Sequence, residues 1–297
     1  MRPTLINGNA LVKVKELEDN SIQSVVTSPP YWGLRDYGDI EQFGCEPTVE
    51  DYAANLVALF DEIKPKLKED GTIWINIGDS YSGFSGNLGG ASGSDQNGKR
   101  NAGVVKRGAN LKKRDLVGVP WVAAFALREA GWYLRCDIIW HKPNPIPESV
   151  TNRPTRAHEF IFLLSKSEKY FYDMDAIREP LVAPPPNQFN SKGGRVIVGD
   201  VSKGKNARDV WSIPTASIRN SHIAVFPEEI PEKCILASTK PGDIVLDPFS
   251  GSGTTCRVAS RLNRNSIGIE LSEKFHNLAV KITLNDSKSL EDYGKKE

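Results

Sequence analysis

The sequence predicts an α/β protein whose sheet is mostly parallel and carries helices on both faces. Two observations predict this class. Short apolar runs alternate with helical patterns along most of the chain, as they do in sheets built from strand–helix–strand units. A length of 297 residues with 39% hydrophobic residues suits one large core with an added piece. Ligands of such sheets bind at the carboxyl ends of the strands, so the residues after each strand are the first candidates for a site.

The expected elements follow from the hydrophobic pattern. Short apolar runs predict strands at 24–27, 71–79, 135–140, 158–166, 242–247 and 265–271. Helical periodicity predicts helices at 51–67, 120–132 and 254–263. Two stretches, about 81–115 and 178–208, are rich in Gly, Ser, Asn, Pro or basic residues and poor in core signal. We expect loops there, and the first should be mobile.

Charge is balanced overall and uneven locally. The net charge is +1, but residues 99–114 hold seven basic residues and no acidic one, whereas residues 35–70 hold four basic and ten acidic residues. A local basic face suits a polyanion such as nucleic acid. A solvated charge run is the alternative interpretation of the same residues.

Several classes are disfavoured by composition. No run of about 18 apolar residues is present, so we expect no membrane span, and the first residues lack the apolar block of a signal peptide. The four cysteines are scattered without a CxxC pair. Two disulfides are formally available, but free thiols in a reducing cytosol fit better. We expect no metal site.

A glycine loop near the C-terminus has the form of a ligand site. The strand 243–247 ends in Asp247 and continues as Pro-Phe-Ser-Gly-Ser-Gly-Thr-Thr. Gly251 and Gly253 let the backbone approach a ligand, and the helix that starts at Thr254 offers free N–H groups to a carboxylate. Glu270 ends the next strand, where it can accept hydrogen bonds from ribose hydroxyls. The pattern is not the dinucleotide motif GxGxxG, and it fits a nucleoside joined to an amino acid. A corner that uses glycine only for packing is the alternative.

A second motif, Ser28-Pro29-Pro30-Tyr31-Trp32, follows the strand at 24–27. The prolines hold an extended corner. The Ser28 side chain and a proline carbonyl can accept hydrogen bonds from an amino group, and Tyr31 offers a face on which a base can stack. Holding both N–H bonds of an exocyclic amine would push its nitrogen towards tetrahedral geometry and aim the lone pair at a methyl donor. A Pro-Pro turn with a core aromatic is the alternative.

Together, TSPPYW and DPFSGSGTT resemble the amino-methyltransferases of DNA, and the resemblance covers most of the chain. Because SPPY precedes the glycine loop, the order is similar to that of the β group. The resemblance implies a Rossmann-like methyltransferase fold with a sheet of the seven-stranded type, an inserted loop and a small target-recognition region. It also implies S-adenosylmethionine as cofactor and double-stranded DNA as partner, with the target base flipped out of the duplex. An acid is common in the family where Asn9 stands here.

The resemblance implies roles for three groups of residues. The catalytic residues are Ser28, Pro29, Pro30 and Tyr31. The cofactor-binding residues are Asp247, Pro248, Phe249, Gly251, Gly253, Thr254, Glu270 and Phe226. The residues that face the target base and DNA are Trp32, Trp140, His141, Lys192, Arg195, Lys112, Lys113 and Arg114.

The same resemblance implies the organisation of the chain. Residues 1–177 form the catalytic half, with the mobile insert at about 81–115. Residues 178–209 form the target-recognition region, and residues 210–297 form the cofactor-binding half of the same domain. We expect a cytoplasmic protein encoded by a bacterium, an archaeon or a phage. A partner restriction endonuclease and a homodimer are both open at this point.

The residue before the two prolines bears on which nitrogen receives the methyl group. A serine before the prolines resembles the N4-cytosine subgroup, so we favour N4 of cytosine, and N6 of adenine stays open. Attack by a thiolate on C5 of cytosine is disfavoured because no Pro-Cys pair is present. The sequence also leaves open a methyltransferase acting on RNA or on a protein glutamine, an inactive relative that binds DNA, and a nucleotide-binding regulator.

Overall fold

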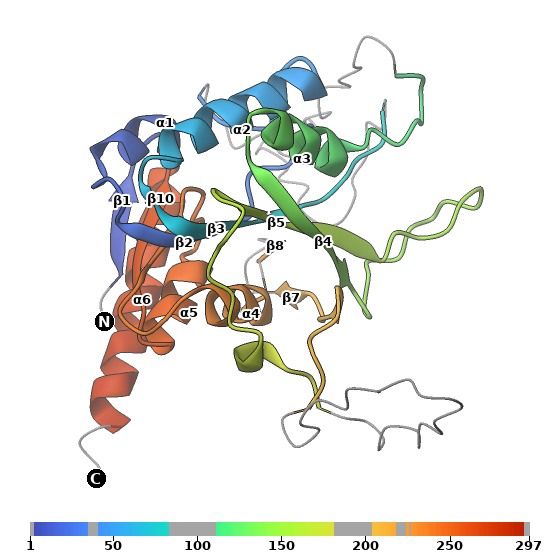
Figure 1. Cartoon of the computed structure of the whole chain (residues 1–297). Helices are drawn as coiled ribbons and strands as arrows, with labels where there is room; N and C mark the ends of the chain where they lie inside the picture. The colour runs from blue at the N-terminus through green and yellow to red at the C-terminus, as the bar shows by residue number, and fades with distance from the viewer. Residues whose placement is uncertain are drawn as a thin grey trace, which may run out of the picture.

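The computed structural model describes residues 3–34, 41–82, 111–180, 204–217, 224–225 and 227–293. Its main strands are β1 (Thr4–Asn7), β2 (Ile22–Thr27), β3 (Leu67–Ile77), β4 (Tyr133–His141), β5 (His158–Ser165), β6 (Val210–Ser212), β9 (Ile244–Asp247) and β10 (Asn265–Glu270). They form one eight-stranded sheet in the order β1-β10-β9-β2-β3-β5-β4-β6 (Figure 1). The short strands β7 (Ala216–Ser217) and β8 (Ala224–Val225) pair separately.

The sheet is parallel except around one strand. β5 runs antiparallel to both of its neighbours, β3 and β4, and the remaining strand pairs of this sheet are parallel. As a result the start of β5 lies at the same edge of the sheet as the carboxyl ends of β2, β3, β9 and β10. Residues at the start of one strand therefore meet residues that follow the ends of the others.

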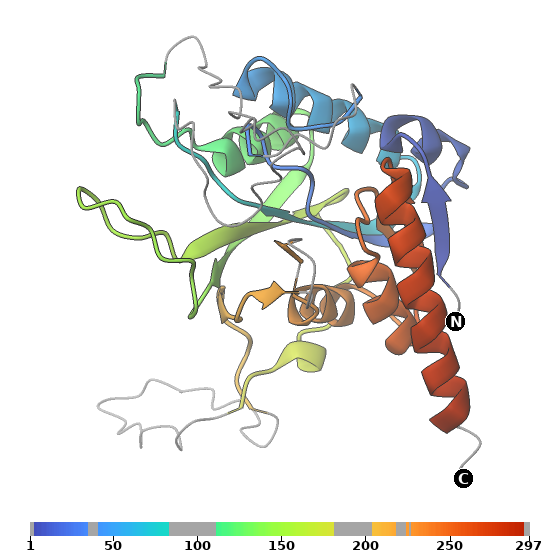
Figure 2. The ribbon, with the colours of Figure 1, turned by 180° about the vertical axis from the view of Figure 1, so that it is seen from behind.

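Helices cover both faces of the sheet. The helices are α1 (Ala10–Lys13), α2 (Val49–Ile63), α3 (Val119–Glu129), α4 (Glu229–Ser238), α5 (Thr254–Arg261) and α6 (Glu273–Tyr293), with 3-10 turns η1 (Val14–Glu16) and η2 (Asp175–Ile177). Figures 1 and 2 show α1, α2 and α3 on one side of the sheet and α4 and α5 on the other, with α6 beside them. This is the layered arrangement that the alternation of apolar runs predicts.

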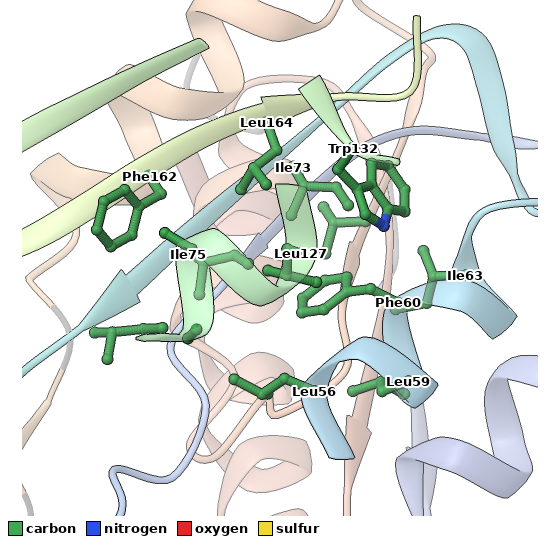
Figure 3. Close-up of a cluster of buried hydrophobic side chains, with 14 of the residues drawn as sticks. Leu56, Leu59, Phe60, Ile63, Ile73, Ile75, Leu127, Trp132, Phe162 and Leu164 are labelled. Atoms are coloured by element: carbon green, nitrogen blue, oxygen red, sulfur yellow. The ribbon is translucent and has the colours of Figure 1, made fainter. Parts of the chain in front are cut away.

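The larger core lies between the sheet and the pair α2 and α3. Figure 3 shows side chains from α2, β3, α3 and β5 meeting there, with Phe60, Ile75 and Phe162 almost fully buried. Burial of this apolar area is the main favourable term in the folding free energy. A second core lies on the other face, where Trp74 and Trp211 stack with ring centroids 6.3 Å apart. The two cores hold the sheet rigid beneath its carboxyl edge.

The predicted α/β class is confirmed, and the differences are local. The predicted helix at 51–67 is too long, because α2 ends at Ile63 and Pro65 lacks the N–H that another turn would need. Its last predicted residue, Leu67, instead begins β3. The apolar runs predict six strands of this sheet and leave out the edge strands β1 and β6, so the sheet has eight strands, one more than the seven-stranded type. Both are short, and β6 is only three residues long.

Two further findings concern the cysteines and the length of the helices. All four cysteines are free thiols. Among the described residues, no helix has both the length and the apolar character needed to cross a membrane.

Candidate active site

The two sequence motifs meet at the carboxyl edge of the sheet. β2, which leads into SPPY, lies directly beside β9, which leads into the glycine loop. The Thr27 hydroxyl donates a hydrogen bond of 2.6 Å to the Asp247 carboxylate. This bond joins residues 220 positions apart in the chain. The parallel pairing therefore places a hydrogen-bonding corner and a glycine loop side by side, as a methyl donor and an acceptor base require.

Asp247 organises the glycine loop. It is buried, and besides Thr27 its carboxylate accepts a hydrogen bond from the Phe249 N–H at 3.1 Å. Burial raises the pKa of Asp247 to about 6, against an ordinary value of 3.8. A raised pKa means that nearby hydrogen bonds do not fully replace the lost hydration of the charge. A cation such as the ammonium group of an amino-acid ligand would supply the missing stabilisation.

Glu270 links the end of β10 to the same loop. Its two carboxylate oxygens accept hydrogen bonds from the Gly251 N–H at 2.8 Å and the Ser272 N–H at 2.9 Å. Burial raises the pKa of this carboxyl group above its ordinary value. Each oxygen keeps a further lone pair, so the carboxylate can also accept hydrogen bonds from hydroxyl groups of a ligand.

The loop itself fits a close backbone approach. Gly251 has a φ of 51°, and a Cβ built on it meets nothing within 4 Å among the described residues. Open space at a left-handed residue beside two acids is the surface that a nucleoside with an amino-acid tail would need. The Ser250 hydroxyl is buried and has no hydrogen-bond partner within the described part of the chain. Pro248 and Thr254 are buried and Phe249 is partly buried, so they shape the loop.

The SPPY corner is anchored through its hydroxyl groups. The Tyr31 hydroxyl lies 2.9 Å from the Asn76 amide oxygen and 2.7 Å from a carboxylate oxygen of Glu159. The Ser28 hydroxyl lies 3.3 Å from the Tyr31 hydroxyl. Burial, and next the negative charge of Glu159, raise the pKa of Tyr31 well above its usual value, so the phenol stays protonated. Pro29 is buried and Pro30 partly buried, which fixes the corner between the two hydroxyl groups.

Residues 41–44, which belong to neither motif, contact residues of both. Phe43 meets Phe249 edge-on, with ring centroids 5.0 Å apart. The Gly33 N–H donates to the Gly44 carbonyl at 2.9 Å, which ties the same segment to the residues after SPPYW. Close by, Asn9 caps α1 and its amide donates to Glu41 at 3.0 Å. An acid is therefore present beside position 9, although it comes from elsewhere in the chain.

Two aromatic predictions for the target base do not fit the structure. Trp32 is 2% exposed, and its indole N–H donates to the Glu46 carbonyl at 3.0 Å. Trp140 is 5% exposed, its N–H donates to the Ile213 carbonyl at 2.8 Å, and Lys142 covers its ring. Both rings are packed in the cores and present no face to a base, so the assignment of these two residues to base contacts is wrong.

The remaining predicted DNA contacts are placed in part. His141 is exposed at the end of β4, within 3.0 Å of the Ser212 hydroxyl. Lys112, Lys113 and Arg114 are exposed just before α3. Backbone hydrogen bonds of 2.8 Å between Ser82 and residues 114 and 115 close the base of the predicted insert. Lys192, Arg195 and Phe226 lie outside the described residues.

The β4–β5 hairpin carries basic residues that the sequence motifs do not indicate. The hairpin loop spans 142–157 and leaves the sheet at the edge that carries the site (Figures 1 and 2). Arg153 lies over the Tyr81 ring at 4.1 Å, and Arg156 donates to the Asp79 carbonyl at 2.5 Å. The loop is thus tied to the end of β3. No short motif marks these residues, because their partners lie more than 70 positions away.

The fold and the site together define a class: a methyltransferase with adjoining halves for a nucleoside-type cofactor and an amino group. A family model described as DNA methylase matches residues 22–281. The chain is 48% identical over 278 residues to the Type II methyltransferase M.Cfr9I of Citrobacter freundii, covering 93% of this chain and 86% of the relative. It is 47% identical to M.SmaI of Serratia marcescens, covering 93% and 88%. The protein belongs to the DNA methylase family, in its β group of amino-methyltransferases.

Solved structures share the fold. The cytosine-N4-specific PvuII DNA methyltransferase aligns with a TM-score of 0.65 and 20% identity, covering 94% of this chain and 86% of that one. A DNA modification methylase of Thermus thermophilus in complex with S-adenosyl-L-methionine aligns with a TM-score of 0.59 and 22% identity, covering 95% and 93%. The cofactor of the protein is S-adenosylmethionine, which supplies an activated methyl group on its sulfonium.

Proposed function

We propose that the protein methylates N4 of cytosine within a short recognised sequence of double-stranded DNA, with the base flipped out of the duplex. One observation carries the proposal. The Ser28 hydroxyl stands at the end of β2, next to the strand that leads into the cofactor loop, and its oxygen lies 3.3 Å from the Tyr31 hydroxyl, to which it can donate. A neutral serine before the two prolines favours N4 of cytosine over N6 of adenine.

The residues of the corner would activate the amine by position alone. An exocyclic amino group is a poor nucleophile because its lone pair is delocalised into the ring. The Ser28 oxygen and the carbonyl of a proline accept hydrogen bonds from its two N–H bonds, which turns the lone pair towards the methyl group. No covalent intermediate on the enzyme is needed. Tyr31 is half-buried and held at its hydroxyl, which would keep the ring fixed for stacking.

At the other side of the site, Asp247, Glu270 and the glycine loop would hold the cofactor. Within the described part of the chain, no cation pairs with the Asp247 carboxylate, which suits the ammonium group of the methionine part. Glu270 has lone pairs left for the ribose hydroxyls. Because Thr27 hydrogen-bonds Asp247, the two subsites keep a fixed separation.

Duplex DNA would lie over the same edge. The exposed Lys112, Lys113 and Arg114 at the base of the insert are placed to contact phosphates, which position the protein without reading sequence. Residues 178–209 stay our proposal for the target-recognition region. Of its described residues, Glu179 pairs with Lys205 and Arg208, so its two ends lie together.

Mass spectrometry of nucleosides tests the proposal. Duplex DNA is incubated with the purified protein and isotope-labelled S-adenosylmethionine, then digested to nucleosides. We expect labelled N4-methylcytosine, and labelling that is roughly 10²–10³-fold slower with the Ser28→Ala variant. Labelled N6-methyladenine would keep the family and overturn the base. If cofactor binds but no label enters DNA, then DNA is not the substrate, and RNA and protein are the next acceptors to assay.

A further inference from the structure

Hydrogen bonds connect the hydroxyl groups of Ser28 and Tyr31 to a carboxylate that lies outside both motifs. Glu159 is the second residue of β5, and the antiparallel course of β5 brings it to the site edge. One Glu159 oxygen accepts from the Tyr31 hydroxyl at 2.7 Å and from the Asn76 amide at 3.1 Å. The other oxygen forms an ion pair with Lys142. A chain of polar contacts therefore runs from Ser28 through Tyr31 to a fixed negative charge.

The number of hydrogens on the hydroxyl and amide groups determines which group donates and which accepts in this series of polar contacts. The Tyr31 hydroxyl has one hydrogen, and the charged oxygen at 2.7 Å is a stronger and closer acceptor than the Asn76 oxygen at 2.9 Å. The Asn76 amide hydrogens go to Glu159 and to the Phe160 carbonyl, each at 3.1 Å, so its oxygen faces the two hydroxyl groups as an acceptor. The Ser28 hydrogen then points inwards, to Tyr31 at 3.3 Å or Asn76 at 3.5 Å.

A hydroxyl whose hydrogen points inwards presents lone pairs outwards. Among the described residues, no donor is directed at the Ser28 oxygen, so those lone pairs are left for a substrate. A neutral serine can donate or accept, and only the second role holds the N–H of an amine. The direction of this hydroxyl is thus decisive for the proposed chemistry.

The surroundings hold the Glu159 side chain in place. The side chains of Glu159 and Lys142 are 15% and 19% exposed, so their ion pair is shielded from water. A Cβ at Gly78 would lie 3.4 Å from the Glu159 carboxyl carbon, so the sheet backbone packs against the carboxylate. The other titratable groups near it are His158, the preceding residue, whose pKa burial lowers, and Arg156, which is itself paired with Asp79.

We propose that Glu159 is a positioning residue that, through the Tyr31 hydroxyl, fixes Ser28 as a hydrogen-bond acceptor for the target amino group. The inference rests on the proposed methyl transfer to an exocyclic amine. It does not depend on whether the base is cytosine or adenine. It assigns to β5 a part in the reaction that neither motif contains.

The test is the Glu159→Gln variant, which keeps the shape of the side chain and removes its charge. We expect kcat for methyl transfer to fall roughly 10- to 100-fold, because the hydroxyl chain loses its fixed direction. The KM for DNA and the Kd for S-adenosylmethionine should change by less than about 2-fold. A matched control is Glu62→Gln, which removes the charge of an ion-paired glutamate from the exposed face of α2. An unchanged kcat in Glu159→Gln, or a change confined to KM, would overturn the inference.

A double substitution shows whether Glu159 acts through Tyr31. In a Tyr31→Phe background the hydroxyl is gone, so adding Glu159→Gln should change kcat by less than about 3-fold. An equal loss in both backgrounds would place the action of Glu159 elsewhere. If Glu159→Gln does not fold, Tyr31→Phe alone must lower kcat at constant KM, and a normal kcat there overturns the inference. Absence of methyl transfer by the unsubstituted protein would instead refute the proposed function.

Discussion

The proposed cofactor half and the proposed catalytic half of this site are built in different ways. In the cofactor half, Asp247 and Glu270 bond to N–H groups of Phe249, Gly251 and Ser272, all within about twenty residues along the chain. In the catalytic half, Ser28 and Tyr31 depend on partners about 50 and 130 positions away, on β3 and β5. Apart from the bond between Thr27 and Asp247, the first half is a local loop motif, whereas the second exists only once the sheet has formed. Substitutions should therefore affect the two halves by different routes.

The largest effect is expected from the substitution of Ser28 in the catalytic half. Ser28→Ala removes the acceptor and should lower kcat by roughly 10²–10³-fold, as removal of one well-placed hydrogen-bonding group does in many active sites. Single-turnover methyl transfer with labelled cofactor measures it. Calorimetric binding of S-adenosylmethionine should be unchanged, and weakened cofactor binding would show that the two halves are not separable.

Gly78, which lies outside both motifs, tests whether the position of the Tyr31 ring matters for catalysis. A Cβ at Gly78 would lie 2.7 Å from the Tyr31 ring, so Gly78→Ala must displace that ring or the strand end. Because small displacements of reacting groups are costly, we expect kcat to fall by about 10- to 100-fold. Steady-state kinetics report it. Wild-type kcat in this variant would mean that the position of Tyr31 is not critical.

In the cofactor half, Asp247→Asn should separate stability from binding. The carboxyl is protonated more readily in the folded chain than in the unfolded one. Its stabilising contribution is complete below pH 3.8 and is lost as the pH rises past about 6. The variant should therefore gain up to about 3 kcal/mol in unfolding free energy at pH 8 without cofactor.

The same variant should bind S-adenosylmethionine about 10- to 100-fold more weakly, because it lacks a charge for the ammonium group. Urea unfolding at pH 5 and pH 8, together with calorimetric binding, measures both changes. A loss of stability at pH 8 would show that the carboxylate is better stabilised in the folded chain than its burial implies.

The basic surface should have a smaller and general effect. Replacing Lys112, Lys113 and Arg114 with alanine should weaken DNA binding by about 10-fold at moderate salt. The slope of log K against log salt should fall by about 0.9 for each phosphate that the protein no longer neutralises. Filter binding over a salt series measures both, with cognate and unrelated duplexes compared. Weaker binding of the cognate duplex alone would indicate base contacts instead.

The smallest effect is expected at the glycine loop. Gly251→Ala has space for its methyl group, but a φ of 51° is costly for alanine, so we expect about 1 kcal/mol of destabilisation. Thermal unfolding with and without S-adenosylmethionine measures it. If cofactor affinity fell by more than about 10-fold, the ligand would contact the position that the added methyl group occupies.

This contrast also explains what could be predicted from the sequence. DPFSGSGTT and Glu270 could be interpreted from neighbouring residues, because strand, turn and helix are consecutive there. Asn76 and Glu159 carry no local signal, because each belongs to an ordinary apolar strand and their relation to Tyr31 arises from sheet order. Trp32 and Trp140 were misassigned for the same reason. An aromatic residue next to a motif is equally consistent with a surface and with a core until its neighbours across the sheet are known.

Because β5 runs antiparallel to β3, a change of length has different consequences within β5 and within the loop that precedes it. In β5, Phe160 pairs with Ile77 and Ile161 with Asn76, so Glu159 lies just beyond the end of β3. Deleting one residue within 160–164 would turn every later side chain to the opposite face and break this alignment. Residues added near position 146, within the 142–157 hairpin loop, would leave the register intact. Lineages of such enzymes could lengthen or replace this loop without altering the spacing that their chemistry needs.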